Sequence, residues 1–410
     1  MGTIFCLAMA LFICCNGYPL GHMRGISYVE QGGRLELPVN GATGWAAVSM
    51  PLYDEPSQNA DTIVQLTAGQ GFTIVKEYGE WWYIRIGGTS DTNDISGWVQ
   101  HRACFVNLPD VIPSLVFDIT NAYSSVKRSG GYDIPNITGH ALYNARAFNW
   151  RLGRYEFIVP VLYSTALRIF EAQQAALADG NTIIIYEAFR PRSAQQSVVG
   201  NLQWLMVSNA SVQRIISTPP WGMNWFIATG TSNHQRGAAI DVGLGRIISQ
   251  ETRMSGLYRY THITVFERHV MPTPMHELSP LAATFTRPVS SSNMDIWRTA
   301  IPATTMTEGA LLLQRYLTNA EFTPLASEWW HYNDLEGVRI ANSAGITGDF
   351  YTETIYSRIP NFQNFIIWGG SYCNNRKETY RRRLENHASV AVMEENPSGA
   401  SQDYGVVLPF

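Results

Sequence analysis

One short stretch, residues 231–243 (TSNHQRGAAIDVG), constrains the fold more than any other part of the chain. It places His234 and Asp241 seven positions apart. In a continuous strand such residues would point to opposite faces, so a turn must lie between them. Gly237 permits that turn. The strand that follows puts the small Ala239 on the same face as Asp241 and leaves space beside the carboxylate. Two converging ligands with space around them predict a metal site.

A second stretch, Ser-Glu-Trp-Trp-His-Tyr at residues 327–332, can complete that site. Three protein ligands and an open position are typical of catalytic zinc, and His331 can be the third ligand. Glu328 lies three positions earlier and can act as a general base toward a water beside the metal. Each stretch alone is weak evidence, because single histidines are usually structural. Together they predict a hydrolytic zinc centre.

These stretches resemble the signatures of the D-alanyl-D-alanine dipeptidases and carboxypeptidases, which belong to the lysostaphin/hedgehog group of zinc peptidases. The pattern Ser-x-His-x-x-Gly-x-Ala-x-Asp matches the chain at every position, and Glu-Trp-Trp-His matches residues 328–331. Residues 186–191 (YEAFRP) are similar to Asp-Ala-Tyr-Arg-Pro of the family. Residues 136–143 (NITGHALY) are similar to a segment of its dipeptidase branch, known from vancomycin resistance. The resemblance runs in order from about residue 110 to residue 358.

The resemblance implies a role for each matching residue. One zinc ion per chain would be bound by His234, Asp241 and His331. Glu328 would be the general base and acid. Arg190 would face the scissile carbonyl and stabilise the oxyanion.

The resemblance also implies substrate contacts, although one segment departs from the family. Ser232, Tyr186 and Thr273 are the expected substrate-binding residues, and for Ser232 a role in shaping the turn alone is an equal alternative. The family's Met-Gly-Thr-x-Phe-Asp corresponds to Met-Pro-Thr-Pro-Met-His at residues 271–276, so the substrate specificity cannot be carried over at these positions. His276 could serve as a fourth ligand, which is the less favoured alternative.

Residues 44–105 have a different texture, with short β-branched or aromatic runs separated by glycine-containing turns. Their order resembles bacterial SH3-like domains, so a small all-β barrel is expected here. Such modules commonly bind peptidoglycan, and a structural role without a ligand is the alternative. Trp81, Trp82 and Trp98 are the candidate contacts, with at least one of them expected in the core.

We therefore predict an SH3-like barrel followed by an α+β zinc peptidase domain with a mixed, mostly antiparallel sheet. Within the second domain, residues 159–179 have the apolar spacing of a helix and residues 182–189 that of a strand. The expected parts are a signal peptide at 1–24, a linker at 25–43, the SH3-like domain at 44–108, the peptidase domain at 109–358 and an extension of unknown role at 359–410.

Composition limits the partners and the location. The net charge of −4 gives no electrostatic case for nucleic acid as a partner. The apolar run at residues 1–15 is too short to span a bilayer and has the length of a signal-peptide core, which predicts a secreted or cell-envelope protein. If the run is not a signal, the protein is expected to be cytoplasmic.

A disulfide between Cys104 and Cys373 is compatible with the sequence but not required by it.

The sequence leaves three functions open. A D-Ala-D-Ala dipeptidase is favoured by residues 136–143. A D,D-carboxypeptidase or endopeptidase acting on peptidoglycan stem peptides is favoured by the barrel, since an enzyme for free dipeptides needs no wall anchor. A non-catalytic zinc module that binds the cell wall is a different class, and Glu328 and Arg190 argue against it because binding alone requires neither.

Overall fold

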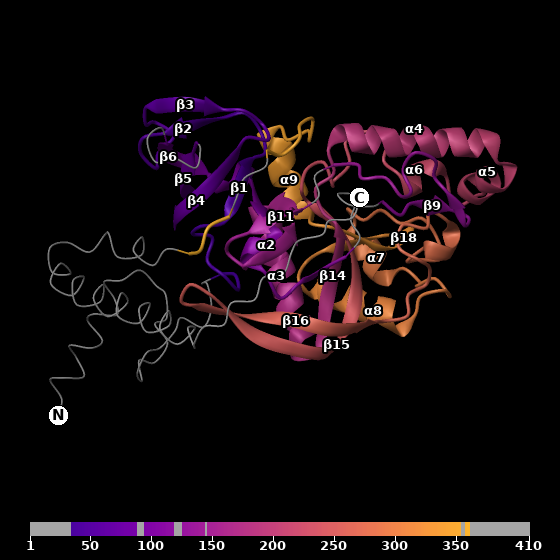
Figure 1. The fold of residues 1–410 in the computed structure, drawn as a ribbon. Helices are drawn as coiled ribbons and strands as arrows, with labels where there is room; N and C mark the ends of the chain where they lie inside the picture. Colours follow the sequence, from indigo (N-terminus) through magenta and orange to yellow (C-terminus); the bar gives the residue numbers. More distant parts are fainter. Residues whose placement is uncertain (1–33, 88–93, 119–124, 144–145, 354–356, 361–410) are drawn as a thin grey trace, which may run out of the picture. The chain divides into compact units, whose positions relative to one another are not determined.

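The computed structural model describes residues 34–87, 94–118, 125–143, 146–353 and 357–360 (Figure 1). The expected signal peptide, Cys373 and the extension beyond residue 360 lie outside this part of the chain. Cys104 is buried and is not in a disulfide within it. The described end of the expected linker, residues 34–43, is packed into the protein, with Leu35 and Leu37 almost fully buried.

The first sheet contains eight strands in the order β13-β7-β1-β4-β5-β6-β2-β3, and all of its pairings are antiparallel. Its strands are β1 (Thr43–Ala46), β2 (Met50–Tyr53), β3 (Thr62–Leu66), β4 (Gly71–Tyr78), β5 (Trp81–Ile86), β6 (Ile95–Gln100), β7 (Cys104–Asn107) and β13 (Pro160–Leu162). Alternation along β5 buries Trp82, Ile84 and Ile86 and leaves the residues between them partly exposed, as expected for a sheet with one face on the core.

The expected closed barrel is wrong. In the described residues the sheet is open, because no pairing joins β3 at one edge to β13 at the other. The edge of β7 that a closing strand would need is occupied by β13, with Val161 paired to Val106. That strand comes from the part of the chain expected to belong to the second domain, so the two parts share one sheet.

The second sheet is mixed and mostly antiparallel, as expected for an α+β fold (Figure 1). Its order is β17-β18-β15-β14-β8, with β16 also paired to β15, and only β14 and β8 run parallel. The strands are β8 (Val116–Phe117), β14 (Asn181–Glu187), β15 (Ala239–Ser255), β16 (Tyr258–Arg268), β17 (Thr323–Leu325) and β18 (Glu328–Asn333). The strand expected at 182–189 is confirmed as β14, and the short ribbons are β9 (Arg128–Ser129) with β10 (Tyr132–Asp133) and β11 (Arg146–Asn149) with β12 (Arg154–Phe157).

Helices cover the second sheet. α3 (Tyr163–Ala178) packs against β14 and α8 (Glu308–Asn319), and α8 also contacts β15, β17 and β18. The helix expected at 159–179 is confirmed in its main part as α3, whose buried positions Ala166, Ile169 and Ala176 have helical spacing. The helices are α2 (Leu108–Val111), α3 (Tyr163–Ala178), α4 (Arg192–Ser208), α5 (Ala210–Ser217), α6 (Met223–Phe226), α7 (Met294–Thr299), α8 (Glu308–Asn319) and α9 (Leu335–Ala344), with 3₁₀ turns η1 (His101–Ala103) and η2 (Pro280–Ala282).

One hydrophobic core runs through both sheets. It includes Leu52, Ile74 and Trp82 from the first sheet together with Val242 and Trp330 from the second. Because Trp82 is fully buried, it cannot contact an external ligand, whereas Trp81 is half-buried on the other face of β5. Within the described residues, no helix has both the length and the apolar character that a membrane crossing requires.

The turn expected at Gly237 is confirmed. Gly237 has φ +64°, in the left-handed region, and its carbonyl accepts a hydrogen bond from Leu162 N at 3.0 Å. A Cβ atom at this position would lie 2.6 Å from the Phe105 ring. The turn that carries His234 into β15 is therefore packed against β7 and β13 of the first sheet.

We predict that Gly237→Ala destabilises the protein by roughly 2–4 kcal/mol, the sum of left-handed strain and overpacking. Gly153→Ala is the matched control, because Gly153 has φ +65° but nothing within 4 Å of its Cβ position. It should cost only the strain, about 1 kcal/mol. Urea unfolding of both variants measures the difference, and equal losses would contradict the close approach to Phe105.

Candidate metal and catalytic site

Three neighbouring strands bring the acidic and basic residues of the site into one row. Asp241 on β15 pairs with Glu187 at the end of β14 on one side and with His331 on β18 on the other. A register irregularity between Ile185 and Glu187 interrupts β14 at this row. Directly opposed residues have adjacent side chains, so the sheet itself determines the spacing of these three groups.

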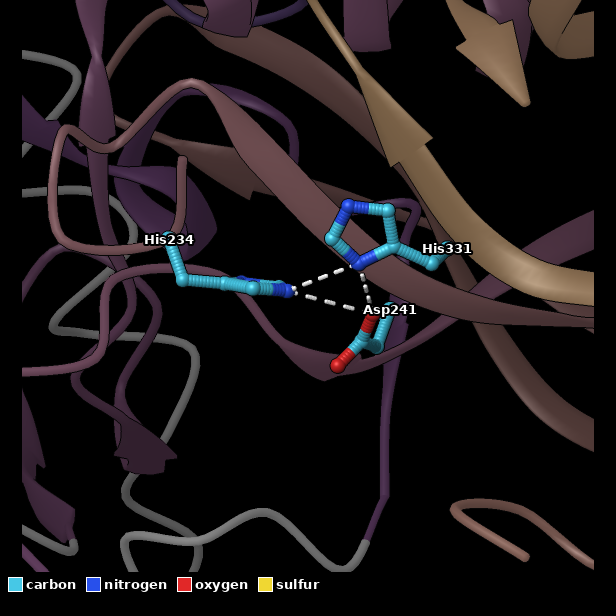
Figure 2. A group of neighbouring side chains, drawn as sticks. All are labelled: His234, Asp241 and His331. Carbon is cyan, nitrogen blue, oxygen red and sulfur yellow. Dashed lines mark hydrogen bonds and ion pairs between the residues drawn. The ribbon is translucent and has the colours of Figure 1, made fainter. Parts of the chain in front are cut away.

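His234, Asp241 and His331 converge as expected (Figure 2). His234 Nε2 lies 3.2 Å from Asp241 Oδ1 and 3.1 Å from His331 Nδ1, and Asp241 Oδ1 lies 3.0 Å from His331 Nδ1. Zinc–ligand bonds of about 2.0–2.2 Å at tetrahedral angles separate ligand atoms by about 3.3 Å. The spacing therefore fits one small cation with a three-ligand site.

The proton of His234 is fixed by a backbone carbonyl. His234 Nδ1 lies 2.7 Å from Ala188 O, which can only accept a hydrogen bond. Nδ1 therefore carries the proton, and in the neutral ring Nε2 presents a lone pair toward the other two residues. Fixing the ring in this way is the usual function of a group behind a metal-binding histidine.

The proton of His331 is fixed by a relay of side chains. Arg236 Nη1 donates to Asn233 Oδ1 at 3.1 Å, so the amide nitrogen of Asn233 points the other way and donates to Asn333 Oδ1 at 2.8 Å. His331 Nε2 donates to the same oxygen at 3.0 Å. An arginine can only donate, so the order of donors and acceptors along the relay is determined. In the neutral ring, Nδ1 of His331 then presents its lone pair to the site.

The second oxygen of Asp241, Oδ2, is in contact with two basic side chains. His276 Nε2 lies 3.1 Å from Asp241 Oδ2, and Arg190 Nη2 lies 3.5 Å from it. Burial raises the pKa of Asp241, but His234 and the surrounding hydrogen-bond donors lower it well below its usual range. Asp241 is thus a carboxylate whose other oxygen faces the two histidines. Three lone-pair-bearing atoms converge there, an arrangement that a bound cation stabilises.

His276 does not join these three ligands. It groups instead with Glu187 and Asp241, with Nε2 3.9 Å from Glu187 Oε2. Glu187 is already paired with two cations, Arg190 and Lys127, so a further cation at this second group would be repelled. The geometry makes His276 a residue that orients Asp241, and the fourth-ligand alternative has no support in these distances.

Arg190 is held rigidly by the same carboxylate. Its Nε donates to Glu187 Oε1 at 2.8 Å, Nη2 donates to Glu187 Oε2, and Nη1 donates to Gln195 Oε1 at 2.6 Å. Burial raises the pKa of Glu187, but Arg190 and Lys127 together have the larger, opposite effect. They hold the pKa of Glu187 well below its usual range, so the carboxylate stays ionised. A paired guanidinium in this position cannot turn away from the site.

Glu328 lies beside the three candidate ligands and is not part of their group. Its Oε2 is 3.8 Å from His331 Nδ1. Burial raises the pKa of Glu328 to about 8. A divalent cation bound nearby would lower that value, as any adjacent positive charge does. A carboxyl group in this environment can exchange a proton near neutral pH, which is the property of a general base.

Most of the expected residues line one cavity of about 150 Å³, well above the roughly 10–15 Å³ that a single water requires. Its wall includes the three ligands, Glu328, Arg190 and Ser232, whose Oγ accepts a hydrogen bond from Gln235 N. Tyr186 and Thr273 are not brought to it. Both line a second cavity with Trp329, where Tyr186 OH accepts from Arg268 Nε and Thr273 Oγ1 accepts from Trp329 Nε1.

Sequence reasoning missed two groups in the cavity wall, Lys127 and Asn333. Neither belongs to a motif. One feature of the sequence draws attention to Lys127: lysine is rare in this chain and occurs only at positions 76, 127 and 377. For Asn333 it is the spacing, because a residue two positions after His331 on a strand points to the same face as the ligand.

Comparisons with known proteins add no identification. No family model matches the chain, and no curated protein matches it in sequence. The geometry of the site is therefore the main evidence for what it does.

We predict that Asn333→Leu weakens zinc binding by about 10- to 100-fold, because the His331 ring loses the acceptor that fixes its proton. Asn333→Asp keeps an acceptor and should retain the affinity of the wild type, and His331→Ala should lose the metal. Competition with a chelating dye measures all three dissociation constants. Equal affinity of wild type and Asn333→Leu would exclude the relay as a determinant of metal binding.

Proposed function

We propose that this protein is a zinc-dependent peptidase that hydrolyses peptide bonds involving D-alanine in peptidoglycan or its precursors, with D-Ala-D-Ala dipeptides as the first candidate substrate. The observation that carries the proposal is the convergence of His234, Asp241 and His331 beside Glu328 and Arg190 in one cavity. Support for D-alanine comes from the motifs that the chain shares with that peptidase group.

The donor set, two imidazole nitrogens and one carboxylate oxygen, suits zinc. When bound, zinc supplies Lewis acidity that lowers the pKa of a water from about 15.7 to about 7. Glu328 would accept a proton from the attacking water and then donate it to the leaving amine. General acid–base groups of this kind typically contribute about 10²–10⁴-fold to the rate.

Arg190 would stabilise the negative charge that develops on the scissile carbonyl oxygen. One such preorganised donor is worth about 3 kcal/mol. Its contacts with Glu187 and Gln195 hold the guanidinium before the substrate arrives, so little reorganisation is needed during the reaction. Ser232 lies in the same wall and can contact the substrate amine.

Two alternatives are retained. A D,D-carboxypeptidase or endopeptidase for stem peptides would use the same chemistry on a longer substrate. A non-catalytic zinc module that binds the wall would need neither Glu328 nor a fixed Arg190, so these residues favour catalysis. The proposed location, secreted or in the cell envelope, depends on the apolar run at residues 1–15.

We predict that Glu328→Gln keeps one zinc per chain but loses about 10²–10⁴-fold in kcat, because the residue moves protons and does not bind the metal. Mass spectrometry of products from free D-Ala-D-Ala and from a muramyl pentapeptide, with wild type and variant side by side, measures this and identifies the preferred substrate. Loss of zinc from Glu328→Gln would mean that Glu328 is a ligand. A wild type that cleaves neither peptide would refute the proposed function.

The first sheet offers a second function, binding to the cell wall, and the SH3-like motifs support it. Tyr53 and Trp81 lie 5.7 Å apart between ring centroids, and Tyr83 lies 5.1 Å from Trp98. Trp98 is itself buried, so it supports the exposed rings and is not a contact of its own. Tyr78 is 61% exposed next to Trp98. Aromatic side chains gathered at a surface are suited to contact sugar rings or peptide stems.

We predict that the double variant Tyr78→Ala/Trp81→Ala reduces pull-down on purified peptidoglycan by roughly tenfold, because two aromatic contacts are removed. Hydrolysis of soluble D-Ala-D-Ala should be unchanged, since no proposed catalytic residue lies on this sheet. Trp204→Ala is the control, because Trp204 is 60% exposed on α4. Unchanged pull-down of the double variant would make this aromatic surface structural.

A further inference from the structure

Lys127 is a buried cation in the wall of the proposed catalytic cavity, and neither the candidate metal site nor the proposed proton transfers use it. Only 3% of its side chain is exposed, and it lines the cavity together with Arg190, Asp241 and Glu328. Its Nζ lies 3.1 Å from Glu187 Oε2, the only hydrogen-bond partner of Nζ within the described residues. An ammonium group has three N–H donors, so two of them remain for a molecule in the cavity.

The carboxylate next to Lys127 does not need it. Glu187 already accepts both bonds of the Arg190 guanidinium and a bond from Tyr143 OH at 2.9 Å. One negative charge therefore lies between two positive charges. The other buried carboxylate beside Arg190 is Asp241, whose charge a cation bound to the three candidate ligands would take up. Because a buried ammonium is stable only when its charge is balanced, the charge of Lys127 is then left for a further anion.

The cavity wall as a whole has an excess of positive charge only when a divalent cation is bound. Lys127 and Arg190 are positive, and Glu187, Asp241 and Glu328 are negative. With a divalent cation on the three ligands, the positive charges exceed the negative ones by one. A neutral peptide carbonyl would not balance this excess, whereas a substrate group that is permanently anionic would do so.

We propose that Lys127 binds the free carboxylate of the substrate, so that the enzyme acts on the terminal peptide bond of peptides that end in an unmodified carboxyl group. This inference rests on the proposed function and narrows it. A dipeptidase or carboxypeptidase presents such a carboxylate next to the scissile bond, and an endopeptidase does not. Lys127 is then a residue that determines specificity, distinct from the groups that move protons.

The substitution Lys127→Met is suited to the test. It conserves most of the side-chain volume and removes the charge, and Glu187 keeps its bonds to Arg190 and Tyr143. Lys76→Met is the matched control, because Lys76 lies over the rings of Tyr83 and Trp98 on the first sheet, outside the cavity wall. Lys127→Arg keeps the charge.

The experiment compares hydrolysis of D-Ala-D-Ala and of its C-terminal amide by the zinc-loaded proteins. Wild type and Lys76→Met should prefer the free acid. Lys127→Met should raise KM for the acid by about tenfold to a hundredfold, the effect of one charged hydrogen bond, with a smaller change in kcat and little change for the amide. Lys127→Arg should keep part of the preference. A Lys127→Met protein that prefers the acid as strongly as wild type would overturn the inference.

A readout without hydrolysis separates this inference from the proposed function. Calorimetric titration of the zinc-loaded wild type with N-acetyl-D-alanine should give binding that N-acetyl-D-alaninamide does not give, and Lys127→Met should lose it. If the wild type cleaves no peptide, the proposed function is wrong and the titration alone decides on Lys127. Equal binding of the acid to wild type and Lys127→Met would show that the carboxylate is held elsewhere.

Discussion

A single buried carboxylate, that of Glu187, organises the site. It binds Lys127 and Tyr143 from the segment between β8 and β14 and Arg190 from the turn after β14, and it lies beside Asp241 on β15. A buried carboxylate in these surroundings must be paired with cations and hydrogen-bond donors, and pairing it fixes where those groups stand. The position of the guanidinium in the cavity wall follows from this requirement, and the ammonium lies beside the same carboxylate.

The part of the site that was predictable from the sequence is local. His234 and Asp241 are joined by one turn whose need for Gly237 is visible in the spacing, and Glu328 and His331 lie on one short strand. Elements with strong periodicity, α3 and β14, were predictable for the same reason. The local structure of each segment depends on about ten consecutive residues, so the sequence pattern alone is sufficient to predict it.

The rest depends on contacts between distant segments. Lys127, His276 and Asn333 reach the site through pairings that no local pattern encodes. The expected substrate-binding roles of Tyr186 and Thr273 are not supported, because neither residue lines the cavity of the candidate site. Tyr186 precedes Glu187 on a strand, so when Glu187 faces the site, Tyr186 faces the other cavity. The prediction of a closed barrel was wrong for a similar reason. The strand that occupies the edge of the first sheet, β13, lies more than fifty residues further along the chain than β7.

That strand, β13, has an evolutionary consequence. A module that is exchanged between proteins needs a boundary that few contacts cross. Here β13 completes the first sheet, and Leu162 within it donates to Gly237 O in the turn that carries His234. Recombination at the border of the first sheet would separate that turn from its support. The two parts are therefore expected to be inherited together, and substitutions in β7 and β13 should be correlated with substitutions around residues 233–238.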